Sequence, residues 1–207
     1  NSIYLKEIAA AQNPNAFYVG QGCNYSIYEQ PAAANRRTKK PIVGYVGALN
    51  SLRLDLSLLE TLARKNKQWD WVFVGPEDLQ FEKSKLHQFE NVAFEGPKRP
   101  EELASYISNF DVAINPQLTN EVTIGNYPRK IDEYLYMGKP TVATETKAML
   151  MFNEHCYLAC DAVGYEMSIK KALHENSIEK ERARKAFAET HSWENSVNSI
   201  YTSIEQL

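Results

Sequence analysis

Residues 111–144 constrain the fold more than any other segment, because they predict a strand, a polar loop, a helix, a tight turn and a second strand in succession. The first apolar run, residues 111–115, stops at Pro116, as expected of a strand buried in a parallel sheet. The second run, residues 140–144, has the same character and follows a turn through Gly138. The segment therefore predicts one strand–helix–strand unit of an α/β protein.

A short helix is predicted between these two strands. Ile131, Leu135 and Gly138 recur at positions i, i+4 and i+7, so one face of the helix is expected against a sheet. Pro128 occupies a position where helices start, because its missing N–H falls among the unpaired donors of the first turn. Gly138 occupies a position where helices stop.

The start of this helix carries unusual charges. Arg129 and Lys130 lie in the predicted first turn, where the helix dipole favours acids, so two cations and free backbone N–H groups converge on one spot. Such a spot suits an anion, and phosphate is the expected one. Glu133 projects from the same face as Lys130 and could accept from two ribose hydroxyls. The alternative is a solvated helix start with an exposed Lys130–Glu133 pair.

The run PRKIDEYLYMGKP at residues 128–140, followed by TVAT, resembles the nucleotide-sugar-binding motif of GT-B glycosyltransferases, particularly family 4. In that family a proline, a lysine and a glutamate precede a short helix that ends in Gly-x-Pro. The resemblance extends from about Pro41 to the C-terminus. It implies that Glu133 binds ribose hydroxyls and that Lys130 lies near the diphosphate, with Arg129 beside it.

Further strand–helix repeats flank this unit. Apolar runs at residues 41–47, 69–75 and 91–96 each end in a glycine and are followed by a helical pattern. They predict a doubly wound α/β domain, Rossmann-like, with a mainly parallel sheet and helices on both faces. In such a sheet the ligand lies outside the carboxyl ends of the strands, where we expect Gly47, Gly75, Gly96 and Asn115.

The resemblance assigns roles to several residues at these strand ends. It implies that Gly47 lets the backbone approach the diphosphate and that Arg53 lies near a basic phosphate-binding position, although Arg53-Leu-Asp-Leu replaces the family's commoner Lys-Gly pair. It also places the loops at Gly75-Pro76 and Lys98 around the nucleotide base. The alternatives are a surface arginine at position 53 and an exposed loop cation at position 98.

The loop at residues 115–127 departs from the family pattern. Many relatives carry two glutamates separated by seven residues, the first of which contacts the donor sugar, but the corresponding position here is Gly125. Glu121 is the only carboxylate in the loop. We expect either Glu121 or the backbone N–H groups of Thr123 to Asn126 to contact the sugar. The residues expected to line the sugar site are Glu121, Thr123, Ile124, Gly125, Asn126 and Tyr127.

Catalytic groups are not readable from the sequence. None of the four histidines (His87, His155, His174 and His191) has a nearby partner that would make it a base, and no metal-ligand spacing is present. We therefore expect no cofactor and no metal. The general base and the acceptor pocket are expected from another domain, so the chain alone should be inactive.

Three parts are expected along the chain. Residues 1–40 would be the end of an N-terminal domain and a linker, residues 41–190 the nucleotide-sugar-binding domain, and residues 191–207 a C-terminal helix that packs on the missing N-terminal domain. The run Ser192-Trp193-Glu194 resembles a motif found before that helix in family 4. Core packing is the expected role of its apolar stripe, and a bare face is the alternative.

Charge and hydropathy bear on which classes of partner are expected. The net charge is −3 and no basic block stands out beyond residues 36–40, so nucleic acid is not an expected partner. No apolar run approaches the roughly 20 residues of a membrane span. We expect a cytoplasmic protein, or one bound to the inner membrane face through the missing domain.

The resemblance implies transfer of a sugar from a UDP- or GDP-sugar to a glycan or lipid-linked acceptor, with retention of configuration. Two other functions stay open on the sequence. A sugar-nucleotide epimerase of GT-B architecture would need acid and base groups from both domains. A non-catalytic nucleotide-binding module would need none.

Overall fold

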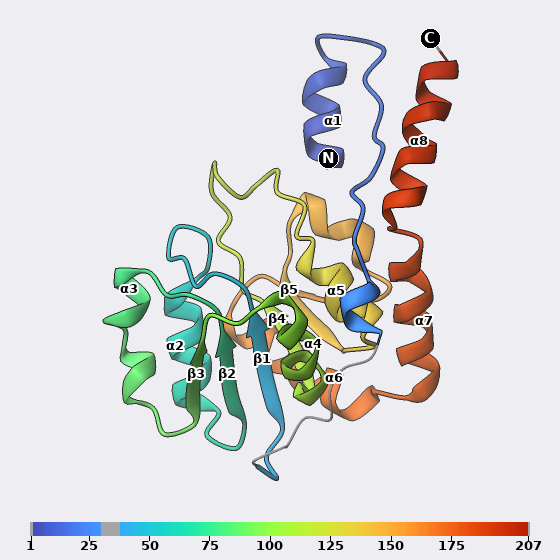
Figure 1. Ribbon diagram of the computed structural model, residues 1–207. Helices are drawn as coiled ribbons and strands as arrows, with labels where there is room; N and C mark the ends of the chain where they lie inside the picture. The colour runs from blue at the N-terminus through green and yellow to red at the C-terminus, as the bar shows by residue number, and fades with distance from the viewer. Residues whose placement is uncertain (1, 30–37, 207) are drawn as a thin grey trace.

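The computed structural model describes residues 2–29 and 38–206, so most of the linker, which the composition of residues 31–40 predicts at the end of the first part, lies outside these ranges. Its centre is a six-stranded sheet in the order β3-β2-β1-β4-β5-β6, with every neighbouring pair parallel (Figure 1). This arrangement confirms the predicted doubly wound, Rossmann-like fold. The strands are β1 (Ile42–Val46), β2 (Asp70–Val74), β3 (Val92–Gly96), β4 (Val112–Asn115), β5 (Thr141–Thr144) and β6 (Tyr157–Ala159).

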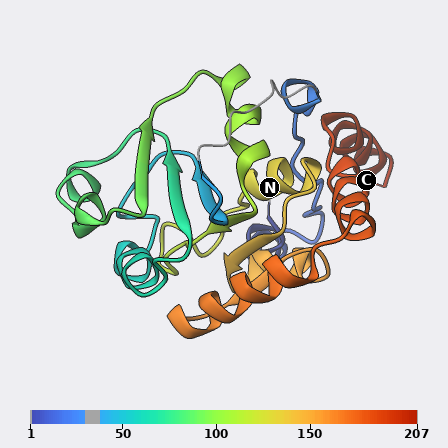
Figure 2. The same cartoon turned by 90° about the horizontal axis from the view of Figure 1, so that it is seen from below.

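Helices cover both faces of the sheet (Figure 2). They are α1 (Ile3–Ala10), α2 (Leu56–Lys65), α3 (Leu79–Glu82), α4 (Pro100–Asn109), α5 (Lys130–Tyr136), α6 (Ala162–Glu175), α7 (Ile178–Glu189) and α8 (Trp193–Glu205), with 3-10 turns η1 (Ser26–Tyr28), η2 (Lys85–Gln88) and η3 (Lys147–Phe152).

The sheet separates two apolar layers, because successive side chains of a strand point to opposite faces. On β1, Val43 and Tyr45 join the layer that contains α2 and α6. Ile42 and Val46 join the layer that contains α4, α5, η3 and α7. All five residues of β1 are buried, which explains why its sequence is a continuous apolar run rather than an alternating one.

Some predicted elements are wrong in detail. The spacing of Leu79 and Leu86 after the second strand predicts one connecting helix, but the chain forms α3 and η2 there, with Leu79 exposed and Leu86 buried. The run at residues 17–22, which resembles a strand that closes the first domain in family 4, is unpaired in the structure, apart from an isolated bridge at the next residue, Cys23, to Ser192. The helical tail is divided into α7 and α8, and the Ser192 side chain caps α8 by accepting from the Asn195 N–H (3.1 Å), which agrees with a separate final helix after residue 191.

The C-terminal helix does not pack into a core. Both α1 and α8 stand beyond the carboxyl end of the sheet, with an extended segment between them (Figure 1). The stripe residues Trp193, Val197 and Ile200 remain 55%, 43% and 44% exposed. The expectation of core packing is therefore wrong for the described part of the chain, and the alternative of a bare apolar face is the arrangement found. No described helix is both long enough and apolar enough to cross a membrane.

Candidate functional site

Glycines turn the chain at the carboxyl ends of β1, β2 and β3. Gly47, Gly75 and Gly96 have φ values of +137°, +148° and +67°, which side-chain-bearing residues rarely adopt. The turns bind one another, since the Gly47 N–H donates to the Val74 carbonyl (2.8 Å) and the Gly75 N–H donates to the Gly96 carbonyl (3.0 Å). A Cβ on Gly75 would lie 2.1 Å from the Gly47 carbonyl oxygen, so only glycine allows the first two turns to approach this closely.

Lys130 brings its ammonium to the turn that follows β1. Its Nζ donates to the hydroxyl of Tyr45 and lies 4.1 Å from the centroid of that ring. A Cβ on Gly47 would lie 2.8 Å from Nζ, so the absence of a side chain there makes room for the cation. Burial lowers the pKa of Lys130 to about 8; Glu133 opposes this shift and Arg53 adds to it. No described carboxylate lies within ion-pair distance (4.0 Å) of Lys130.

The helix that carries Lys130 is fixed at both ends. The backbone carbonyl of Pro128 accepts a hydrogen bond from the Ile131 N–H (2.8 Å) in the turn that leads into α5. Gly138, at φ +70°, closes the other end, where its own N–H and that of Lys139 donate to carbonyls of the last turn (2.8 and 2.9 Å). The predicted stop at Gly138 is confirmed, and the helix starts two residues later than Pro128. Arg129 is consequently the N-cap residue, and Lys130 is the first helical residue.

Glu133 lies one turn further along α5 and is largely shielded, with a side chain only 13% exposed. Arg129 approaches it, with 3.5 Å between Nε and Oε1, and the hydroxyl of Tyr28 lies close enough to influence its pKa. Burial raises the pKa of Glu133, whereas Arg129, Tyr28 and Lys130 lower it. The alternative of an exposed Lys130–Glu133 pair is therefore wrong: Glu133 pairs with Arg129, and Lys130 contacts Tyr45.

The other residues expected at the nucleotide lie at different distances from this centre. Arg53 is exposed in the turn before α2 and close enough to Lys130 to influence its pKa. Pro76 is exposed, and its carbonyl accepts the Leu49 N–H (2.8 Å), which ties the turns after β1 and β2 together. Lys98 follows β3 and lies over the ring of Tyr106 on α4, 5.4 Å from its centroid. The structure thus groups Lys130, Gly47 and Arg53, while Lys98 lies at the edge strand.

The loop between β4 and α5 satisfies most of its own polar groups. The N–H groups of Thr123, Ile124 and Asn126 all donate to acceptors within the loop, and the Thr123 hydroxyl donates to the Leu118 carbonyl. These three N–H groups are therefore not free to cradle a sugar in this arrangement. Glu121 is exposed, and its carboxylate is the ionisable group that the loop offers to solvent.

A groove separates this loop from α1. It has a volume of about 710 Å³ and includes Glu121, Ile124, Gly125 and Asn126 among the residues that line it. The Ser2 hydroxyl donates to the Gly125 carbonyl (2.8 Å) and so joins α1 to the loop. Another cavity of about 550 Å³ lies between α4 and the strands β2 and β3, and none of the residues expected to bind nucleotide lines it.

Tyr127 turns away from the groove, and its contacts reveal a cluster that sequence analysis missed. Its hydroxyl donates to the buried carboxylate of Asp132 (2.7 Å), which also pairs with Nδ1 of His191 (2.8 Å). Tyr28, the partner of Glu133, was missed as well. Asp132 and His191 are 59 positions apart, so no local spacing could have joined them. The one signal in the sequence was a second acid, Asp132, next to Glu133 in the predicted helix; its burial is known only from the structure.

The arrangement suits an anion beside a diol. Lys130 and Arg53 supply positive charge at a glycine turn, and Glu133 supplies a hydrogen-bond acceptor one helical turn away. Among the described residues, no cluster of three or more histidine, cysteine or acidic side chains is placed to hold a metal ion.

Comparisons with known proteins identify the family of the chain. Residues 40–174, more than half of the chain, match the family model described as Glycosyl transferases group 1. TuaH of Bacillus subtilis (strain 168), which carries the description of a teichuronic acid biosynthesis glycosyltransferase, is 27% identical over 204 residues. That alignment covers 91% of this chain and 51% of TuaH, so the chain spans about half the length of this curated relative.

Solved structures share the fold. A glycosyltransferase from Rickettsia africae matches with a TM-score of 0.78 at 14% identity, over 99% of this chain and 62% of that one. HepE from Anabaena, solved in complex with UDP, matches with a TM-score of 0.66 at 15% identity, over 100% of this chain and 54% of that one. The chain belongs to the glycosyltransferase group 1 family (family 4), and its fold is one half of the GT-B architecture.

Proposed function

We propose that the chain is the donor-binding half of a glycosyltransferase and holds a UDP- or GDP-sugar at the carboxyl ends of β1 and β4. The observation that carries this proposal is the placement of Lys130 and Glu133 on one turn of α5. The ammonium of Lys130 faces the Gly47 turn, and the carboxylate of Glu133 is shielded beside it. A nucleoside diphosphate presents the negative charge of the diphosphate and, next to it, the two hydroxyls of the ribose. Lys130 matches the charge and Glu133 matches the hydroxyls.

Each residue near this centre has a proposed role. Lys130 and Arg53 bind the diphosphate, with Arg129 at the rim, and Gly47 lets the backbone approach it. Charge develops on the diphosphate as the sugar leaves, so these cations stabilise the transition state more than the ground state. Glu133 accepts from the ribose hydroxyls. The residues proposed around the base are Gly75, Pro76 and Lys98.

The donor sugar is proposed to lie toward the groove beside the loop of residues 120–126. Glu121 is the carboxylate that can reach it, and Ile124, Gly125 and Asn126 line the same groove. Thr123 and Tyr127 support the loop rather than touch the sugar, because their hydroxyls donate to Leu118 and Asp132.

The remaining parts of the reaction are proposed to come from a partner domain. The acceptor, a glycan or a lipid-linked sugar, and the general base belong there, and the bare apolar face of α8 is proposed to pack against it. The chain alone therefore binds donor without turnover. Transfer with retention of configuration at the cytoplasmic face is the proposed outcome in the whole enzyme.

Calorimetric titration with UDP, GDP and ADP tests the proposal, and UDP comes first because HepE, which has this fold, was solved with it. The chain should bind one nucleotide selectively, and Glu133→Ala should weaken that binding by about 1.5–3 kcal/mol, the range for a hydrogen bond to a charged group. Glu90→Ala is the control, because Glu90 lines the cavity near α4. Unchanged affinity in folded Glu133→Ala, or a loss in Glu90→Ala instead, would overturn the assignment.

A further inference from the structure

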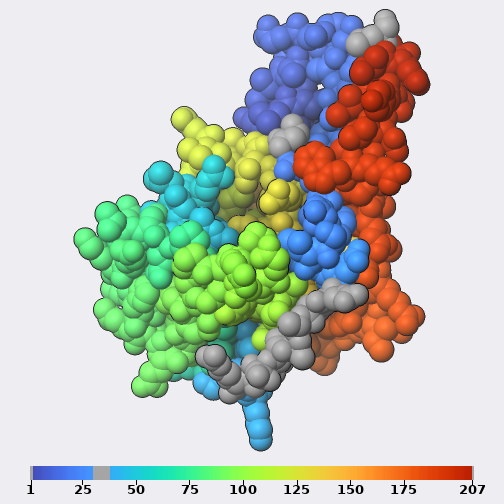
Figure 3. Space-filling view, viewed as in Figure 1, coloured from blue at the N-terminus to red at the C-terminus, as the bar shows by residue number. Residues whose placement is uncertain are grey.

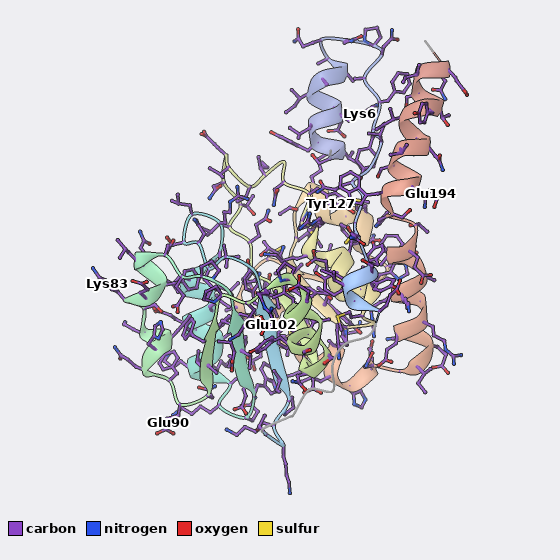
Figure 4. The ribbon with its side chains drawn as sticks, in the orientation of Figure 1. Lys6, Lys83, Glu90, Glu102, Tyr127 and Glu194 are labelled. Atoms are coloured by element: carbon purple, nitrogen blue, oxygen red, sulfur yellow. The ribbon has the colours of Figure 1, made fainter. Side chains whose placement is uncertain are left out.

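Asp132 is a fully buried acid that directly precedes Glu133, the residue proposed to bind the ribose. Its exposed fraction is 0%, and its carboxylate accepts from Tyr127 and pairs with His191. Tyr127 is labelled in Figure 4, near the start of α5. Neighbouring residues of a helix point in directions about 100° apart, so Asp132 faces the interior while Glu133 faces the site. The pair with His191 therefore holds the turn of α5 that presents Glu133.

His191 lies between α7 and α8 and holds a second element. Its ring packs against Phe187, with 4.7 Å between centroids, and its backbone carbonyl accepts the Cys23 N–H (3.0 Å). The hydroxyl of Tyr25 donates to the Ala188 carbonyl (2.6 Å) in the same place. Residues 23–28 are thus fixed along the C-terminal helices, where they form a blue ridge beside the red helices in Figure 3.

These residues lead directly to the donor site. The segment 23–28 ends at Tyr28, which is buried and whose hydroxyl lies close enough to the carboxylate of Glu133 to lower the pKa of that acid. Two routes therefore run from His191 to Glu133. One passes through Asp132, the residue before Glu133, and the other passes through the backbone of residues 23–28 to Tyr28.

We infer that His191 and Asp132 are positioning residues of the donor site, which hold the Glu133 carboxylate in the orientation that receives a ribose. The inference rests on the proposed function, since it assigns a purpose to the orientation of Glu133. An ordinary buried pair would stabilise the fold without regard to the ligand. A positioning pair acts through Glu133, so its effect on binding must disappear when Glu133 is removed.

A thermodynamic cycle separates these two roles. UDP affinity is measured by calorimetry or ligand-observed NMR for His191→Leu, in the otherwise unchanged chain and in the Glu133→Ala background. We expect about a 10-fold loss of affinity in the first case and less than about a 2-fold loss in the second, because residues linked through one network of contacts are energetically coupled. An equal loss in both backgrounds would show a purely structural role and overturn the inference.

Matched variants complete the test. His155→Leu is the control, because His155 also stacks on Phe187, with 4.2 Å between centroids, and has no described hydrogen bond to Asp132. Its effect on affinity should stay within about 2-fold. His191→Asn should recover most of the affinity, because its side-chain amide can donate near the position of Nδ1. Failure of Asn to do better than Leu would count against the inference.

Folding and the proposed function are checked separately. Should His191→Leu fail to fold, Asp132→Asn keeps the volume and is expected to lower affinity in the same Glu133-dependent way. Full affinity in folded Asp132→Asn and folded His191→Leu, alongside a loss in Glu133→Ala, would overturn the inference alone. Full affinity in Glu133→Ala, or no nucleotide binding by the unmodified chain, would overturn the proposed function and the inference together.

Discussion

The ammonium of Lys130 contacts the hydroxyl of Tyr45 and lies 4.1 Å from the centroid of its ring. Burial raises the pKa of Tyr45, so the phenol stays neutral near neutral pH and does not balance the charge of Lys130. The same burial lowers the pKa of Lys130 to about 8. The contact thus holds the cation in place at the Gly47 turn and leaves its charge for a ligand.

Nucleotide binding should weaken as the pH rises above about 8. A diphosphate favours the charged form of Lys130 and raises its pKa, so binding takes up a proton once the free lysine is deprotonated. The affinity for UDP should then fall by up to about tenfold per pH unit. Titrations between pH 7 and pH 9.5 measure this slope. Lys130→Arg keeps its charge and should show a flatter profile; tighter binding at higher pH would contradict the assignment.

Gly47→Ala should damage both stability and nucleotide binding. Alanine would have to adopt the φ of +137° that the turn requires, which residues with a side chain rarely do. Its Cβ would also lie 2.8 Å from Nζ of Lys130, so the cation would have to move. We expect a loss of about 1–3 kcal/mol in unfolding free energy, measured with urea. Gly20→Ala is the control, because its φ is +71° and the added Cβ would meet only the Ser196 hydroxyl, at an ordinary contact distance of 3.5 Å. It should cost stability while leaving UDP affinity unchanged.

Tyr134→Phe should loosen the end of β1. The buried hydroxyl of Tyr134 accepts the Val46 N–H (2.8 Å), the last residue before the Gly47 turn. Without the hydroxyl this buried N–H loses its partner, at a cost of about 1–3 kcal/mol in unfolding free energy. Urea unfolding measures the cost, and hydrogen exchange at the Val46 amide should become faster. Exchange at that amide no faster than in the unmodified chain would show that another acceptor replaces Tyr134.

Much of the fold could be predicted because its signals are local. The strand at residues 112–115, the helix stop at Gly138 and the strand at residues 141–144 follow from apolar runs and from residues with restricted backbone angles. Parallel strands place their carboxyl ends at one edge, so the meeting of Gly47 and Gly75 followed as well. The residues of the Pro128–Gly138 motif were found in the same way.

Helical periodicity identified the apolar stripe of α8 but not what covers it. An amphipathic pattern states that one face is apolar, and it does so equally for a packed helix and a bare one. Trp193 and Ile200 remain partly exposed, although Gly22 of the extended segment lies against the Trp193 ring. The same limit applies to Leu79, which has the spacing of a core residue and lies on the surface.

The sequence by itself determined the strand–helix succession, the glycine turns and the presence of Lys130 and Glu133 on one short helix, because each of these depends on groups within a few positions of one another. Only the tertiary structure decided their partners. Lys130 meets Tyr45 across 85 positions, and Asp132 meets His191 across 59. These pairs arise from the way the helices and the N-terminal segment pack on the sheet, and burial in that packing sets their pKa values.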